Sequence, residues 1–272
     1  GGDWSTGDTW SDEVNHTIHQ QHVTGNQLEL ESGSVTLSVP AEGSATTLAS
    51  LELSEPDLVI LQGFTINTDT AQSEEYPDDY DPALGYTSRG FGFSVALTDS
   101  GDVTVTANVR WGPRDRDDMN RALEAATTEV TVHYAALYGV EESKHAHYSG
   151  AQDLAHDPPN SEQASLTEDL TWSGFGVAAI QSFDLLLHDT DGGPGGDYLR
   201  SFGVEIPPGE SGQAPETLET EILTSSVLEL GTMSMQAEAD LVWIPLSPEH
   251  NAIQGVTVEG THPVGSYTVP LD

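Results

Sequence analysis

Apolar and polar residues alternate along most of the chain, and this alternation predicts β-strands. In residues 90–111, apolar residues alternate with small or polar ones on both sides of the polar stretch 99–102. A period of two residues is typical of a strand with one buried face, and the polar stretch predicts a turn. We therefore expect a β-hairpin here. A similar hairpin is expected over residues 26–40, with its turn at residues 32–34.

Helical periodicity is scarce, and a single segment carries clear helix signals. Residues 115–129 place acidic residues in a first turn and good helix formers after them. Acidic side chains favour the start of a helix because they face the positive end of its dipole. The segment therefore predicts a connector helix of about three turns.

Short sequence matches recur in the same order in two parts of the chain and predict an internal duplication. Gln62 and Phe64 match Gln181 and Phe183, and an apolar run precedes each pair. Further matches join residues 89–92 to 200–203, 107–111 to 239–243, and 130–132 to 256–258. The spacing between matches changes only across loop-like stretches, where length changes cost little.

The expected fold is therefore all-β, with two tandem β-sandwich or jelly-roll units that arose by duplication and one short connector helix. We expect the first unit at residues 45–142 and the second at residues 163–272. The polar residues 143–162 are expected to form a linker between them. Residues 1–44 would then be an N-terminal β extension or an arm that packs on a neighbouring subunit.

The charge of the chain indicates the medium in which this fold is stable. Seven Lys and Arg residues stand against 45 Asp and Glu residues, which gives a formal net charge of −38. The acids are spread along the whole chain among core-forming residues, so they belong to a folded surface and not to an acidic tail. Salt at about 1 M shortens the screening length to roughly 3 Å and removes most of the repulsion. We interpret the composition as adaptation to molar salt; an acidic protein of ordinary salinity is the alternative.

The composition also excludes several classes of function. No basic stripe is present to meet phosphates, so direct binding to nucleic acid is not expected. No apolar run reaches the roughly 18 residues that a membrane-spanning helix needs. The absence of cysteine excludes disulfides, thiolate metal sites and cysteine nucleophiles. Motifs of serine hydrolases, P-loop enzymes, dinucleotide-binding folds and zinc proteases are also absent, so no catalytic residue is assigned and no enzyme is expected.

One segment is the best candidate for an ion site. Asp189, Asp191 and Asp197 lie on a glycine-rich turn. Hard cations such as Ca²⁺ bind several carboxylate and carbonyl oxygens on a sharply bent backbone. The alternative is a loop whose acids are only hydrated, and no other cofactor is expected.

Four of the seven basic residues fall within twelve positions and form a candidate interface. They are Arg110, Arg114, Arg116 and Arg121. Arginine forms two-pronged pairs with carboxylates, so the cluster would bind the acidic surface of a neighbouring subunit. Internal pairing with nearby aspartates is the alternative of equal weight.

A pair of histidines, His145 and His147, falls inside the expected linker. On a strand, residues two apart point to the same side, and zinc could use such a pair. A third ligand supported by a strand is missing from the sequence, so the metal interpretation of this pair is weak.

The acidic, cysteine-free, lysine-poor composition and the tandem β units together resemble structural proteins of viruses that infect halophilic archaea. The resemblance covers composition and architecture over the whole chain and includes no diagnostic motif. It implies a non-enzymatic capsid, turret or tail component located in the virion, which assembles with copies of itself and with other virion proteins. The alternative is a secreted, extracellular carbohydrate-binding or adhesion module of a halophilic archaeon. In that case, exposed aromatic rings would stack on a host-surface glycan, and the candidates are Trp4, Trp10 and Trp172.

Overall fold

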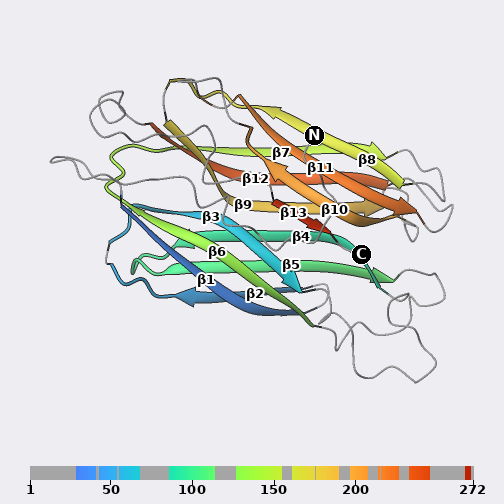
Figure 1. Ribbon diagram of the computed structural model, residues 1–272, viewed down its shortest axis with the longest axis horizontal. Coiled ribbons are helices and arrows are strands. Elements are labelled where there is room, and N and C mark those ends of the chain that lie inside the picture. The colour runs from blue at the N-terminus through green and yellow to red at the C-terminus, as the bar shows by residue number, and fades with distance from the viewer. Residues whose placement is uncertain are drawn as a thin grey trace.

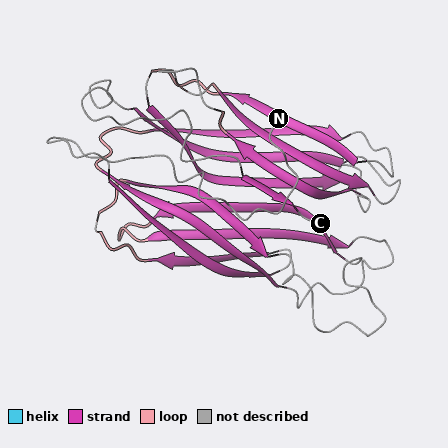
Figure 2. Ribbon diagram, viewed as in Figure 1, coloured by secondary structure: helices cyan, strands magenta, loops and turns pink. Residues whose placement is uncertain are grey.

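The computed structural model shows that the described part of the chain is built of β-strands. No helix occurs in it (Figure 2), and therefore none that could cross a membrane. The prediction of an all-β fold is confirmed. The described residues are 29–40, 43–53, 55–67, 86–113, 127–154, 161–174, 176–189, 197–207, 214, 216–226, 233–245 and 267–270.

The first six strands form one unit with two groups of three strands. These strands are β1 (Glu29–Pro40), β2 (Gly43–Ala49), β3 (Leu58–Asn67), β4 (Tyr86–Leu97), β5 (Val103–Pro113) and β6 (Thr127–Tyr138). Strand β6 lies between β1 and β3, and β5 lies between β2 and β4. All of these pairings are antiparallel. The two groups face each other and bury alternate residues between them, as in a sandwich.

The next six strands repeat this pairing order. They are β7 (Lys144–Leu154), β8 (Ser161–Asp169), β9 (Gly176–Asp189), β10 (Asp197–Glu205), β11 (Thr217–Ser226) and β12 (Met233–Pro245). Strand β12 lies between β7 and β9, and β11 lies between β8 and β10. A short strand, β13 (Tyr267–Pro270), adds to the edge of β10. The first unit occupies the lower half of Figure 1 and the second unit the upper half. Strands β1–β6 and β7–β12 therefore share one pairing order, and the duplication stays a prediction.

Two of the sequence matches fall on strands that occupy equivalent places. The Gln-Phe match joins β3 to β9, and the match of 89–92 with 200–203 joins β4 to β10. The match of 107–111 with 239–243 is wrong as an equivalence, because it joins β5 to β12, and β12 corresponds to β6. Residues 256–258 of the fourth match lie outside the described residues.

The strands bear on two of the expected unit boundaries. The expected linker, 143–162, contains the whole of β7, which pairs with β12 over eleven positions, so these residues form a strand of the second unit. The expected N-terminal β extension, 1–44, contains β1, which pairs with β6 along its full length and so adds a strand to the first unit. Strand β7 was not predicted, because an edge strand with a polar outward face needs few apolar residues.

The structure confirms one of the predicted hairpins and contradicts the turn predicted for the other. The hairpin at 90–111 is confirmed as β4 and β5, with a turn closed by the Thr98 amide donating to the Asp102 carbonyl at 2.9 Å. The turn expected at residues 32–34 is wrong, because those residues continue β1 and pair with β6. Pairing with a distant strand has overridden the local turn signal. Most of the predicted helix lies outside the described residues, and its last residues, 127–129, belong to β6.

Strand β9 joins the two units into one sheet of nine strands. One edge of β9 pairs with β12 along its whole length. On the opposite edge, residues Leu186 to Ser182 pair with Gly90 to Ser94 of β4. Beyond them, Ile180 pairs with Leu61 of β3. The sheet therefore branches at β9, because β3 and β4 belong to different layers of the first unit.

The repeated glutamines occupy β-bulges at this branch point. Gln62 is the residue skipped where the register of β3 with β6 shifts. Gln181 is the residue skipped where the register of β9 with β12 shifts. A bulge inserts one unpaired residue and bends its strand. The equivalent bulges therefore lie where two equivalent strands meet, beside the Leu61–Ile180 pair.

A cluster of phenylalanine rings fills the core between the units. Phe202 of β10 is buried and stacks on rings of three other strands. Its ring centroid lies 5.7 Å from that of Phe64, 5.4 Å from that of Phe91 and 6.1 Å from that of Phe183. Phe64 in turn stacks on Phe93 at 4.0 Å. Buried residues from both units thus form one continuous core.

Replacing Phe202 by alanine should therefore destabilise both units together. We expect the free energy of unfolding to fall by about 3–5 kcal/mol, because a large buried ring is lost and a cavity remains. Urea titration followed by tryptophan fluorescence and circular dichroism measures this change, and both signals should still give one shared transition. Leu48→Ala is the control, because that side chain is 63% exposed and its loss should change stability by less than about 0.5 kcal/mol. Two separate transitions in the wild-type protein would contradict the shared core.

Candidate functional site

The branch in the sheet opens a groove between the two units. Its volume is about 670 Å³, which lies in the range of small-molecule sites. The first unit contributes residues before and within β3 and the end of β4, and the second unit contributes β7, β9 and β12. The lining residues are Asp57, Leu58, Val59, Ser94, Val95, Ala96, Leu97, Ser143, His145, Ala146, His147, Gln181, Ser182, Asp240 and Leu241.

A row of polar side chains crosses the floor of the groove. The strand registers place His147 opposite Asp240, and Asp240 opposite Ser182. Asp240 accepts a hydrogen bond of 2.7 Å from His147 Nδ1 and one of 2.5 Å from Ser182 Oγ. More than half of the His147 and Asp240 side-chain surfaces remain exposed, at 59% and 55%. The carboxylate is therefore held in position and still faces solvent.

A second set of hydrogen bonds fixes the bulged glutamine. Gln181 Nε2 donates to the carbonyl oxygen of Val59 at 2.9 Å, and Gln181 Oε1 lies 3.2 Å from His145 Nδ1. The other ring nitrogen of His145 lies 3.4 Å from Ser143 Oγ. Gln181 thus joins the edge of β3 to a side chain of β7. These two contacts link the two walls of the groove.

The two histidines point to the same side of β7, as expected from their spacing on a strand. Both line the groove, but each is engaged by a different partner. Among the described residues, no group of three or more His, Asp or Glu side chains is arranged to hold a metal ion. The histidine pair therefore acts as a set of hydrogen-bonding groups in this arrangement.

The Ser182–Asp240–His147 row differs from a nucleophilic triad. In a triad, the imidazole lies between the serine and the carboxylate and accepts the serine proton. Here the carboxylate lies in the middle, and Ser182 Oγ donates to Asp240. The imidazole is thus on the far side of the carboxylate from the hydroxyl. This row is therefore not arranged to activate Ser182.

The contacts of Asp240 change its acidity. Burial tends to raise the pKa of this carboxyl, but the hydrogen bonds from Ser182 and His147 and the positive charge of His147 outweigh it. The net result is a pKa below the usual value. The carboxylate form is therefore favoured in the folded protein.

A second polar cluster joins the units on the same sheet. Arg110 of β5 forms an ion pair with Asp184 of β9, with Nη1 and Oδ1 3.1 Å apart. Asn108 Nδ2 donates to the other carboxylate oxygen of Asp184 at 3.1 Å. The side chains of Arg110 and Asp184 are about two-thirds buried, with exposed fractions of 35% and 33%. Arg110 is thus engaged within its own chain, with a partner much more distant in sequence than the nearby aspartates.

Two glycines of β4 leave room for groups of the neighbouring strands, and one of them lies at this ion pair. Strand β4 lies between β5 and β9, so side chains from the outer strands must cross it. A Cβ atom on Gly92 would overlap the Asn108 amide and the Asp184 carboxylate. A Cβ atom on Gly90 would overlap the backbone carbonyl oxygen of Leu185. The alternation of glycine and phenylalanine in β4 therefore leaves one face open for the cluster and fills the core on the other.

The other site residues predicted from the sequence have separate outcomes. Trp172 is partly buried, and its ring stacks on the buried Trp243 at 5.6 Å, so packing accounts for its position. Asp189 ends β9 and Asp197 begins β10, but their side chains are not among those described. The cation site therefore stays a prediction. Residues Trp4, Trp10, Arg114, Arg116, Arg121 and Asp191 lie outside the described residues.

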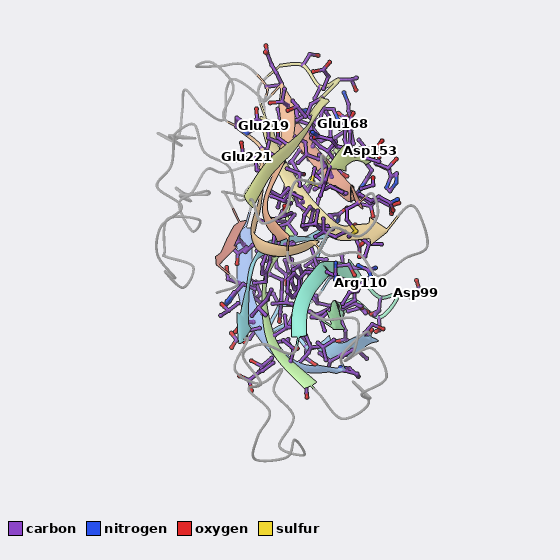
Figure 3. The ribbon with its side chains drawn as sticks, turned by 90° about the vertical axis from the view of Figure 1, so that its right-hand side faces the viewer. Asp99, Arg110, Asp153, Glu168, Glu219 and Glu221 are labelled. Atoms are coloured by element: carbon purple, nitrogen blue, oxygen red, sulfur yellow. The ribbon has the colours of Figure 1, made fainter. Side chains whose placement is uncertain are left out.

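Several acidic side chains lie on the outer faces of the second unit. Figure 3 labels Glu219 and Glu221 of β11 and Asp153 of β7 in this half of the molecule. Glu168 of β8, also labelled, lies instead on the same face of its strand as Leu166 and is directed towards Gly150 of β7. Along β11, Leu218, Thr220 and Ile222 are buried, so the glutamates between them share the opposite face. The spread of acids seen in the sequence thus corresponds to a charged face outside an apolar core.

Sequence reasoning missed the groove and the ion pair. Asp184 and Asp240 carried no motif, and their partners come from distant strands. The signals that pointed to the region were the Gln-Phe match and the histidine pair. Only the strand registers bring these residues together.

The substitution Gly90→Ala should lower the free energy of unfolding more than Gly92→Ala does. At Gly90 the backbone of β9 must shift, and we expect a loss near the upper end of about 1–3 kcal/mol in unfolding free energy. At Gly92 the side chains can move away, at the cost of an ion pair worth about 1 kcal/mol or less. Urea titration measures both losses.

A double-mutant cycle separates the backbone overlap at Gly90 from the side-chain overlap at Gly92. Arg110→Met removes the ion pair beforehand, so it should reduce the cost of Gly92→Ala and leave that of Gly90→Ala unchanged. Equal costs for the two glycine variants in both backgrounds would contradict the crossing of β4 by these side chains.

The lowered pKa of Asp240 predicts a pH-dependent contribution to stability. A carboxyl with a lowered folded pKa stabilises the protein above its unfolded value, and this contribution is lost as the pH falls through the folded pKa. Wild type should therefore exceed Asp240→Asn near pH 5, and the difference should shrink as the pH falls below about 4. Because the carboxylate is more than half exposed, the difference should not exceed about 1 kcal/mol. Urea titrations between these pH values measure it.

Ser182→Ala provides the matched variant for this series. It removes one hydrogen bond to Asp240, so the loss of stability caused by Asp240→Asn should be smaller in the Ser182→Ala background. A loss that stays the same across the whole pH range would contradict the proposed stabilisation of the carboxylate.

The chain was compared with models of known protein families, with curated protein sequences and with solved structures, and none of these comparisons gave a match.

Proposed function

We propose that this protein is a non-enzymatic structural component of a halophilic virus particle, as a capsid, turret or tail protein. The observation that carries the proposal is the fusion of two sandwich-like units through one continuous core. Strand β9 and the Phe202 cluster join the units at their centre. Such a body offers broad faces for lateral packing with copies of itself and with other virion proteins.

The ion pair between Arg110 and Asp184 adds to the rigidity of this body. Its two side chains come from different units, so they oppose sliding of one unit against the other. Fixed geometry matters for a repeated building block, because small angular errors would accumulate over an assembly. The structure favours a mechanical role over one that requires domain motion.

The acidity of the chain supports a protein that assembles in molar salt. A net charge of −38 would keep copies apart at low ionic strength. Screening at high salt would allow their faces to approach. Assembly and salt adaptation are thus compatible, and both are consistent with a virion protein of a virus whose host lives in molar salt.

A secreted carbohydrate-binding or adhesion module is the second candidate. The groove of about 670 Å³ favours it, because its walls carry several hydrogen-bonding side chains. Stacking on aromatic rings would depend on Trp4 and Trp10, since Trp172 is already stacked on Trp243. This candidate places the protein outside the cell.

Light scattering after size exclusion tests the first candidate. In about 3 M KCl, where charges are screened, we expect a closed oligomer or continued assembly. The variant Arg114→Gln/Arg116→Gln/Arg121→Gln should reduce assembly if the arginine cluster contacts the acidic surface of a neighbour. A stable monomer at every concentration in this salt would contradict the structural role and favour the glycan-binding candidate.

A further inference from the structure

Six strands from both units form one continuous sheet with a common outer face. Their order is β7-β12-β9-β4-β5-β2, and each neighbouring pair is antiparallel. Phe93, Phe183 and Ala239 are buried on the inner side of this sheet, so the residues that alternate with them lie on the outer side. The registers align the outer residues in rows that cross the molecule. One row is Ser149, Glu238, Asp184, Gly92, Asn108 and Ser44, and the next is His147, Asp240, Ser182, Ser94, Thr106 and Thr46.

The two halves of this outer face differ in charge. In the half formed by β7 and β12, Glu238 and Asp240 are exposed. In the half formed by β4, β5 and β2, the described outward residues include no acid; Asp99 and Asp102 belong to the turn beyond the strand ends. Because 45 of the 272 residues are acidic, a face that is only solvated would be expected to have acids on these strands too. The acid-free half contains Ser44, Thr46, Leu48, Ser94, Ala96, Thr104, Thr106, Asn108 and Arg110.

The acid-free half exposes groups that favour contact with another protein surface. Leu48 is the most exposed large apolar side chain among the described residues, and its burial would release water. The hydroxyl groups of Thr46 and Thr106 lie 2.9 Å apart. A hydroxyl has one donor and two acceptor positions, so this pair can still bond to a group of a partner. Hydroxyl groups that donate and carboxylates that accept are complementary, and the two halves of the face supply one kind each.

The size of the whole face fits a contact between two protein molecules. Six strands about 4.8 Å apart, each contributing about eight residues, cover roughly 700–800 Å² in projection. A stable interface buries about 800 Å² on each partner. The acid-free half alone offers about half of this area, so a stable contact needs both halves of the face.

Charge selects the way in which two such faces can meet. A two-fold axis perpendicular to the strands would place β12 over β12 of the second copy, so carboxylates would face carboxylates. A two-fold axis parallel to the strands places β12 over β5 of the second copy, and β7 over its β2. Asp240 then faces the second copy's Thr106, and the acids of each copy meet hydroxyl groups instead of acids. This arrangement avoids repulsion between two molecules that each have a net charge of −38.

We propose that a second copy of this chain packs on the six-stranded face about a two-fold axis parallel to the strands. The acidic half of each copy covers the acid-free half of the other, which makes a closed, self-complementary dimer. The proposal rests on the assembly role proposed above, and it names the face and the orientation through which copies pair.

Cysteine cross-linking of the full chain in about 3 M KCl tests the orientation, because the wild-type chain has no cysteine. The variants Glu238→Cys and Thr106→Cys are mixed and treated with a short bismaleimide. We expect cross-linked dimers in the mixture and little cross-linking of either variant alone, since β12 faces β5 of the other copy and not itself. Cross-linking of Glu238→Cys with itself at the level of the mixture would indicate the perpendicular axis and overturn the proposal.

Matched charge variants test the contact without cross-linking. Thr106→Glu places an acid opposite the acids of the second copy, so the dimer dissociation constant should rise by about ten-fold or more, as for like charges juxtaposed in an interface. Thr106→Lys reverses the sign and should not weaken the dimer. Thr131→Glu is the control, because Thr131 pairs with Thr36 on the outer face of the other layer just as Thr106 pairs with Thr46. Sedimentation equilibrium measures the constants, and equal effects of Thr106→Glu and Thr131→Glu would overturn the proposal.

Light scattering of the wild-type protein separates a wrong face from a wrong function. Assembly without a cross-link between Glu238→Cys and Thr106→Cys would overturn the proposed face and leave the assembly role in place, with copies meeting through another surface. A monomer at every concentration would overturn both. Circular dichroism confirms that each variant is folded before it is measured.

Discussion

Strand β9 is the constraint on which the rest of the structure depends. One of its edges is fully used by β12, and its other edge is divided between β3 and β4 of the first unit. A strand in this position must satisfy hydrogen-bond partners from both units at once. The bulge at Gln181 allows this, because it bends β9 where its neighbour changes from one layer to the other. The fusion of the units, the shared core and the groove all follow from that one strand.

The residues of β4 form the other half of the contact between β9 and the first unit. Its phenylalanines, Phe91 and Phe93, enter the core and reach the ring of Phe202 through the cluster. Its glycines, Gly90 and Gly92, leave the opposite face clear for the backbone of β9 and for the Arg110–Asp184 pair. A larger residue at either glycine would force β9 or its side chains away. The short alternating stretch therefore encodes both the apolar and the polar contact between the units.

The sequence predicts those features of the structure whose residues lie close together in the chain. It does not predict features that depend on pairing between distant strands. Alternation at 90–111 predicts the hairpin because both strands and their turn lie in one segment. The Gln-Phe match correctly relates β3 to β9, since the same bulge recurs in each. Strand β7 is missed because its inward residues, such as Ala146 and Gly150, are small and its outward face is polar. The Arg110–Asp184 pair and the groove are beyond local signals, because they depend on registers between strands far apart in the chain.

Surface charge and the shared core both affect the equilibrium between the folded and unfolded protein. Repulsion among the acids opposes compaction of each unit, whereas the shared core makes the loss of one unit expose apolar residues of the other. Two separate sandwiches with this charge would respond to falling salt independently. In the fused molecule, the ring of Phe202 and the pairing of β4 with β9 couple the responses, since neither unit can open without breaking them. The fusion thus turns two acidic domains of moderate size into one cooperative body, and the groove exists only while that body is intact, because each unit supplies one of its walls.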